Sequence, residues 1–290
     1  MVTSTRIFSW LDKVKIIPAA IGQTLLRAYK NGFTDSAAAM AFDFVFALFP
    51  AVLILVAFIE AFGLSPDEFV VLIDEWGIVL PNPLMEVFEE NLRHLASSSE
   101  KLLVVGLVGV LIPASASMST TMTALNRAIG ANEKRSFWQR RIFSVLMLIF
   151  IGLFLVGLFS AIVFAEQVEF WIRSVLPMTE HMPSLVVWMR RLGGIFGVLF
   201  TVLIIYRYVP AKRIAWKHLL PGGIFFLIVW SLIALAVRYY LLKFSYLNLV
   251  SGALGGAIAI LLSAYLLSSV LLLGGGLNAT LLRLNWWDTD

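Results

Sequence analysis

The sequence predicts an all-α integral membrane protein: a six-transmembrane-helix bundle with interfacial N-terminal helices and an external amphipathic helical pair. Hydrophobic residues make up 60% of the 290-residue chain and charged residues 14%, whereas soluble domains average about 45–50% and about 25%. The mean hydropathy is +0.90. Several apolar runs also approach the roughly 20 residues that a helix needs to span a hydrocarbon core. Only lipid can solvate so much apolar surface.

The first expected element is a cytoplasmic or interfacial amphipathic segment over residues 1–36. Residues 6–30 mix apolar with basic side chains, a pattern typical of helices that lie in the membrane interface. Packing against the base of the bundle explains the pattern equally well. The first long apolar run begins near Ala37, too far along the chain for a cleavable signal peptide, so we expect the N-terminus to be mature sequence.

Residues 37–282 are expected to form the membrane domain. Its six apolar runs are 37–62, 102–123, 142–165, 192–209, 219–242 and 252–280. Pro50 and Pro113 lie in two of them and predict kinks, which are tolerated where neighbouring groups satisfy the freed carbonyls. Residues 63–101 interleave acidic with apolar side chains, with a Leu-Pro-Asn-Pro break at 80–83. We expect this insertion to be the external helical pair.

Lysine and arginine predict the orientation, because cytoplasmic connections carry an excess of both. Six spans place both termini, including the tail 283–290, on the side that carries more basic residues. We therefore expect a multi-pass protein of the inner (plasma) membrane with cytoplasmic N- and C-termini. Two cytoplasmic loops hold the main basic clusters, Arg135, Arg140 and Arg141 in one and Arg207, Lys212, Arg213 and Lys217 in the other.

These loop cations are expected to fix the topology and, in addition, to contact anionic lipid headgroups. RNA binding is a distant third interpretation, because no aromatic platform or recognised nucleic-acid module accompanies the charges. The expected partners are therefore membrane lipids and no nucleic acid. A homo-oligomer stays open.

Four segments carry a further signal in their order and spacing. They are AAAMAFDFVFALFP (37–50), ALNRAIGANEKRSFWQRR (124–141), RYVPAKRIAWKHLLPGG (207–223) and SGALGGAIAILLSAYLLSSVLLLGGGLNA (251–279). Together they resemble the YihY/BrkB family of bacterial inner-membrane proteins over nearly the whole chain. The resemblance implies six spans, cytoplasmic termini and no settled biochemical activity. Members have carried labels such as ribonuclease BN, serum-resistance factor and virulence factor.

The chain departs from the family pattern at three places. Asp43 stands where similar proteins usually have an aromatic residue, Gly276 where they often have Glu, and Ser263-Ala264 where a Leu-Trp pair is common. A role that depends on that Glu cannot be carried over to this chain.

Asp43 is the most informative ionisable residue, because it lies about two helical turns inside the first span. Pro50 follows seven residues later, on the same helix face. Intramembrane acids commonly mark pathways, so Asp43 could be a proton- or cation-responsive group that lines a cavity. The alternative is a structural carboxylate that reaches the cytoplasmic interface or pairs with an arginine.

The second span is polar in its cytoplasmic half, where Ser115, Ser119, Thr123 and Asn126 share one face by three- and four-residue spacing. Such a face lines a wet cavity or hydrogen-bonds neighbouring helices. The sixth span ends similarly, at Asn278, and contains small residues that favour tight packing, with a flexible gate at Gly274–Gly276 as the alternative. We take Asp43, Pro50, Ser115, Ser119, Thr123, Asn126 and Asn278 as the cavity hypothesis.

No catalytic, metal or cofactor site is expected. The chain has no cysteine, the acids of the cytoplasmic face are scattered, and no Walker loop, H-E-x-x-H or G-x-S-x-G occurs. A kinked, partly polar bundle with an intramembrane acid favours a non-enzymatic protein that moves or handles a small solute or lipid at the cell envelope. The alternative is a non-catalytic scaffold for envelope assembly or integrity; a membrane-embedded enzyme or ribonuclease is the least favoured.

Overall fold

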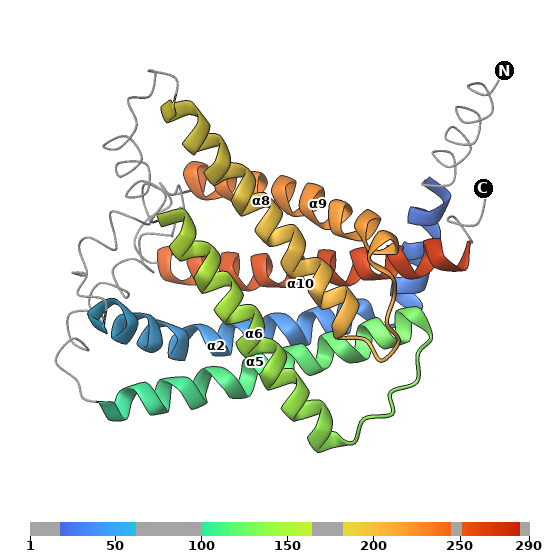
Figure 1. The fold of residues 1–290 in the computed structure, drawn as a ribbon, viewed down its shortest axis with the longest axis horizontal. Coiled ribbons are helices and arrows are strands. Elements are labelled where there is room, and N and C mark those ends of the chain that lie inside the picture. The colour runs from blue at the N-terminus through green and yellow to red at the C-terminus, as the bar shows by residue number, and fades with distance from the viewer. Residues whose placement is uncertain (1–17, 62–99, 164–181, 245–250, 285–290) are drawn as a thin grey trace. The chain divides into compact units, whose positions relative to one another are not determined.

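The computed structural model describes residues 18–61, 100–163, 182–244 and 251–284, and all regular structure in these ranges is helical (Figure 1). Residues 18–30 form a first helix. It is followed by α2 (Phe33–Ala61), α5 (Glu100–Ile129), α6 (Phe137–Val163), α8 (Met182–Tyr208), the short 3-10 helix η1 (Trp216–His218), α9 (Leu220–Phe244) and α10 (Ser251–Arg283). The all-α prediction is confirmed for these residues.

Each of the six expected apolar runs overlaps one long helix over its described residues. Among the described residues, four stretches are long and apolar enough to cross a membrane: Gly106–Ile129, Phe137–Leu158, Trp216–Val237 and Ile260–Arg283. α8 contributes a shorter apolar stretch, Leu192–Tyr208. Pro50 and Pro113 lie within the uninterrupted helices α2 and α5. The expected external pair at 63–101 lies almost entirely outside the described residues, as do residues 1–17 and most of the tail.

Local sequence signals set the connection between α5 and α6. Gly130 has a positive φ of 72°, and the amides of Gly130 and Ala131 donate to the carbonyls of Arg127 and Asn126. This is a Schellman motif, in which a left-handed glycine ends the helix. α6 then begins with a capping box, because Ser136 and Gln139 exchange side-chain-to-amide hydrogen bonds of 2.9 and 3.4 Å. The basic loop between the helices is therefore short and held at both ends.

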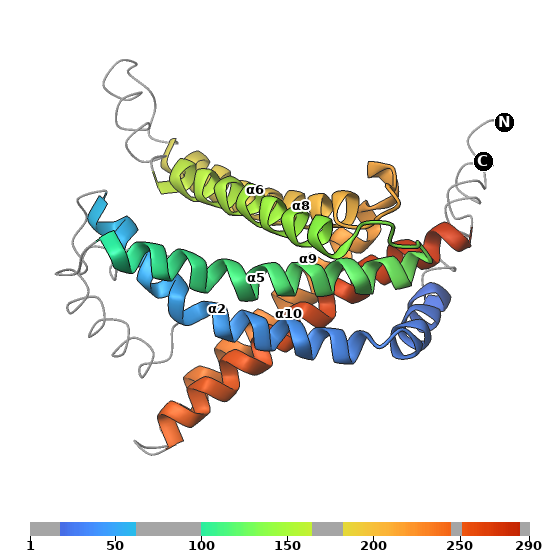
Figure 2. The ribbon, with the colours of Figure 1, turned by 90° about the horizontal axis from the view of Figure 1, so that it is seen from below.

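The described residues fall into two compact units. The first comprises Met1–Asn31, Met122–Ile228 and Leu273–Asp290, and the second comprises Gly32–Thr121 and Val229–Leu272. In the first unit α6 and α8 pack side by side and run in opposite directions (Figure 2). In the second unit α2 and α5 are also antiparallel neighbours, joined where the Thr121 hydroxyl lies 3.4 Å from the Met40 sulfur.

Close helix packing in the first unit depends on glycine. A Cβ atom at Gly274 would meet the Tyr206 hydroxyl and would lie 2.6 Å from the Gly222 carbonyl oxygen, and one at Gly275 would meet the Leu125 side chain. Tyr206 itself is 2% exposed. Small residues let helices approach to this degree. The geometry around Gly274 therefore favours tight packing over a flexible gate.

Candidate functional site

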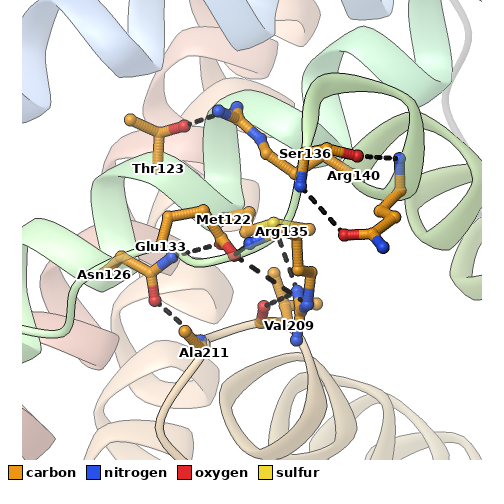
Figure 3. Close-up of polar contacts among 10 residues, drawn as sticks. Met122, Thr123, Asn126, Glu133, Arg135, Ser136, Arg140, Val209 and Ala211 are labelled. Atoms are coloured by element: carbon orange, nitrogen blue, oxygen red, sulfur yellow. Dashed lines mark hydrogen bonds and ion pairs between the residues drawn. The ribbon is translucent and has the colours of Figure 1, made fainter.

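Asn126 lies at the centre of a polar cluster in the first unit (Figure 3). Its side chain is 4% exposed. The amide nitrogen Nδ2 donates to Glu133 Oε2 at 2.8 Å, and the amide oxygen Oδ1 accepts from the backbone N–H of Ala211, also at 2.8 Å. One side chain at the end of α5 thus joins the α5–α6 loop to the loop that follows α8.

Arg135 supports the same junction. Its Nη1 lies 3.3 Å from both the Val209 carbonyl oxygen and the Met122 sulfur, and its guanidinium stands 4.2 Å from the Phe143 ring centroid. Glu133 accepts a hydrogen bond from the Arg135 backbone N–H at 3.0 Å and forms an ion pair of 3.9 Å with the Arg135 side chain. The Nη1 group of Arg135 is therefore directed into the protein.

Arg140 and Thr123, which the sequence assigned to different roles, lie together. Arg140 Nη2 donates to Thr123 Oγ1 at 3.0 Å, so this pair links α6 to the polar end of α5 (Figure 3). Arg283, near the end of α10, donates to the Ala128 carbonyl at 3.1 Å. Ala128 lies in the last turn of α5, where carbonyls lack partners within the helix, so Arg283 satisfies one of them.

Asn278 of α10 forms similar hydrogen bonds to the backbone near the start of α9. It is 1% exposed. Its Oδ1 accepts from the Gly222 N–H at 2.7 Å, and its Nδ2 donates to the Leu219 carbonyl at 3.1 Å. The first N–H groups of a helix have no partner within it, so Asn278 completes the N-terminus of α9. Both hydrogen-bonding ends of this amide are engaged inside the protein.

Asp43, Ser115 and Ser119 belong to the second unit, whereas Thr123 and Asn126 belong to the first. Asp43 and Ser119 are half-buried, and Ser115 is buried with its hydroxyl donating to the Ile112 carbonyl at 3.0 Å. Thr120 and Thr121 likewise donate to backbone carbonyls of their own helix. The Pro50 side chain lies outside the described part of the chain, and the cavity hypothesis stays a prediction.

Four of the remaining predicted basic residues lie in or beside the loop between α8 and α9. Lys212, Arg213 and Lys217 are exposed, and Arg207 donates from Nη1 to the Ile214 carbonyl within the same loop. Arg141, near the start of α6, is half-buried. Glu133 is the one acidic residue in the described part of the first unit, and it is already paired. The surface formed by this loop is therefore strongly positive.

Sequence reasoning did not identify three parts of this arrangement: Glu133 as the partner of Asn126, Tyr206 as the residue against which Gly274 and Gly275 pack, and the aromatic side chains beside Arg207. The Ser136–Gln139 capping box was detectable from its spacing. Tyr206 and Gly274 are far apart in the sequence, so no local pattern predicts their packing.

Long apolar helices with basic ends define an integral membrane protein, and the comparison with known sequences agrees. The chain belongs to the virulence factor BrkB family, whose match covers residues 24–285. Its relatives include membrane proteins of the UPF0761 group. The family expectation from the sequence is therefore confirmed.

Three relatives show how similar the chain is to known sequences. The ribonuclease-like protein YfkH of Bacillus subtilis (strain 168) is 24% identical over 85% of this chain and 89% of its own length. The UPF0761 membrane protein Nmul_A0452 of Nitrosospira multiformis is 24% identical over 92% of this chain and 62% of its own. The UPF0761 membrane protein Mpe_A1422 of Methylibium petroleiphilum is 25% identical over 93% of this chain and 62% of its own.

The chain thus spans less than two thirds of the length of these two UPF0761 relatives. No solved structure matches it.

Proposed function

We propose that this protein is a six-span inner-membrane protein, with both termini in the cytoplasm, that moves or handles a small solute or lipid at the cell envelope through a polar cavity. The observation that carries the proposal is the contact of Met40, about one helical turn before Asp43 in α2, with Thr121 in the polar part of α5. A carboxylate at that depth is costly, about 2.5–3.5 kcal/mol at a helix centre and less nearer the interface, unless water or a partner reaches it.

The contact between Met40 and Thr121 fixes the level of Asp43 along α5. Asp43 is three residues beyond Met40 in α2, and Ser117 is four residues before Thr121 in the antiparallel α5. Both steps are about one helical turn. Asp43 therefore lies level with Ser117, within a run of α5 that also contains Ser115 and Ser119. Water that reaches these side chains would solvate the carboxylate.

A non-catalytic envelope scaffold is the second candidate, favoured by the engagement of Asn126 and Asn278. Both amides, which the cavity hypothesis included, form hydrogen bonds that hold helices and loops together. A scaffold requires that rigidity and requires no passage. The two candidates differ in what Asp43 does, because a scaffold tolerates the loss of its charge.

We also propose that the protein is not a ribonuclease, although one relative is named ribonuclease-like. In the ranges that the structure describes, no three His, Cys, Asp or Glu side chains gather into a group that could hold a metal ion. RNA cleavage assisted by two metal ions needs such a cluster of ligands. Metal-dependent RNA cleavage that survives stringent purification and disappears in Asp35→Asn or Glu133→Gln would contradict this proposal.

The function is tested in proteoliposomes that contain the full chain. One assay follows headgroup-labelled phospholipid between leaflets by chemical quenching, and the other follows entry of small polar solutes by vesicle swelling. We expect activity in one of the two assays, lowered about tenfold by Asp43→Asn, which corresponds to about 1.4 kcal/mol in the barrier. Asp35→Asn is the matched control, because Asp35 is an exposed acid in the first turn of the same helix.

Activity that is equal in wild type, Asp43→Asn and Asp35→Asn would remove Asp43 from the mechanism. No movement in either assay, with correctly inserted protein, would contradict transport and favour the scaffold.

A further inference from the structure

Four aromatic side chains of the first unit form a continuous row. Phe154 of α6 lies 5.4 Å from Phe200 of α8, centroid to centroid. Phe200 and Trp216 of η1 stack with parallel rings 6.0 Å apart, and Tyr208 meets Trp216 edge-on at 6.2 Å. We call Phe154, Phe200, Trp216 and Tyr208 the aromatic row. Phe200 is 44% exposed and Trp216 39% exposed, so the row is accessible from outside the protein.

Two arginines at the connection between α8 and α9 lie against one end of this row. The Arg207 guanidinium lies 5.5 Å from the Trp216 ring centroid, and the Arg213 guanidinium lies 5.8 Å from the Tyr208 ring centroid. Lys212 and Lys217 are exposed on the same loop. Cation–π contacts at these distances hold guanidinium groups over aromatic faces. The loop thus joins positive charge directly to exposed aromatic surface.

No acid in the described part of the first unit compensates this charge. Glu133 is the one acidic residue there, and it is engaged by Asn126 and Arg135. The complementary partner of the loop is therefore anionic. Uncompensated basic residues at the cytoplasmic end of a membrane helix attract anionic headgroups.

The other end of the row identifies the partner as a lipid and not a polar polyanion. Phe154 and Phe200 lie on the packed pair α6 and α8, where Leu153 and Phe196 are exposed apolar neighbours. α6 includes one of the stretches long enough to cross a membrane. A nucleic acid would meet polar surface at both ends of such a row, whereas an acyl chain extends naturally from a headgroup onto apolar helices.

We propose that an anionic phospholipid binds here, with its phosphate at Lys212, Arg213 and Lys217 and an acyl chain along Trp216, Phe200 and Phe154. Tryptophan and tyrosine suit the level between headgroup and hydrocarbon, since their rings have apolar faces and polar edges. The site uses none of the residues of the Asp43 hypothesis. It therefore stands whether or not the protein transports anything.

The test uses the full chain in mixed micelles that contain either phosphatidylglycerol or phosphatidylcholine. Each lipid carries brominated acyl chains, which quench tryptophan fluorescence. We expect phosphatidylglycerol to quench more than phosphatidylcholine at equal mole fraction. Trp216→Phe should remove most of this excess quenching by phosphatidylglycerol. Lys212→Gln/Arg213→Gln should weaken the apparent binding about fivefold for each charge removed.

Arg127→Gln/Lys134→Gln is the matched control, because it removes one exposed arginine and one exposed lysine elsewhere in the same unit. It should leave the excess unchanged. Should the loop variant fail to fold, the wild type still decides the question, because high salt should abolish the excess and soluble glycerol phosphate should not compete.

Equal quenching by the two lipids would overturn the proposal. So would an equal loss in the two double variants, which would mean that any positive charge suffices, and so would full competition by glycerol phosphate, which would assign the loop to a free anion.

Discussion

At the scale of single residues, buried amides hold this protein together at points far apart in sequence. Asn278 satisfies a backbone N–H and a carbonyl near the start of α9, and Asn126 connects two loops. Removing one partner of a buried hydrogen bond costs more than the bond contributes, because the remaining group is left without water.

Asn278→Ala should therefore lower the free energy of unfolding by about 1–3 kcal/mol. The Gly222 N–H and the Leu219 carbonyl would lose their side-chain partner in a buried site. Thermal unfolding of the purified protein in detergent measures the effect. Gln23→Ala is the control, since it removes an exposed amide, and it should leave the midpoint unchanged. An Asn278→Ala midpoint equal to that of wild type would show that these bonds contribute nothing.

The sequence singled out Asn126 and Asn278 but did not predict the contacts they make. Asn126 and Asn278 are recognisable because each is an amide at the end of an apolar run. The Asn126 partner Ala211 lies 85 positions away along the chain and the Asn278 partner Gly222 lies 56 positions away, and only packing brings these pairs together. For the same reason the sequence did not predict that Arg135 and Arg140 each donate a hydrogen bond into the protein, and their contact with headgroups stays a prediction.

At the scale of helices, close approach at glycine sets the packing of α8, α9 and α10 within the first unit. Tyr206 and the Gly222 carbonyl occupy the space that a side chain at Gly274 would need. The positions of the helices were predictable, because an apolar run in lipid must satisfy its own backbone and so becomes helical over its whole length. Which helices pack against one another was not predictable, since apolar surfaces of similar composition do not specify partners.

Gly274→Ala should destabilise the protein by about 1–3 kcal/mol, the usual cost of overpacking a filled site. Adding Tyr206→Phe should recover part of the loss, because it removes the hydroxyl that the new methyl group meets. Gly152→Ala in α6 is the control. Its added Cβ meets nothing within 4 Å, so it should be neutral or slightly stabilising through helix propensity. Equal midpoints of thermal unfolding for Gly274→Ala and Gly152→Ala would contradict the packing account.

At the scale of the whole molecule, the proposal is a six-span topology with a cytoplasmic basic side. Reporter fusions after Ala131 and after Arg213 should give cytoplasmic signals, because both positions lie in basic connections. A fusion near position 98, in the segment outside the described residues, should give an external signal. A cytoplasmic signal at position 98 would require a different number of spans before α5.

The water-accessible carboxylate at Asp43 is the central claim, and the absence of native cysteine allows a direct test. Single cysteines are placed at 43, at 119 and, as a lipid-facing control, at the exposed apolar position 42. Labelling by a membrane-impermeant thiol reagent is then measured from each side of the membrane. We expect labelling at 43 and 119 from the cytoplasmic side alone and none at 42. Absence of labelling at both 43 and 119 in folded, correctly inserted protein would contradict the claim and make Asp43 a structural residue.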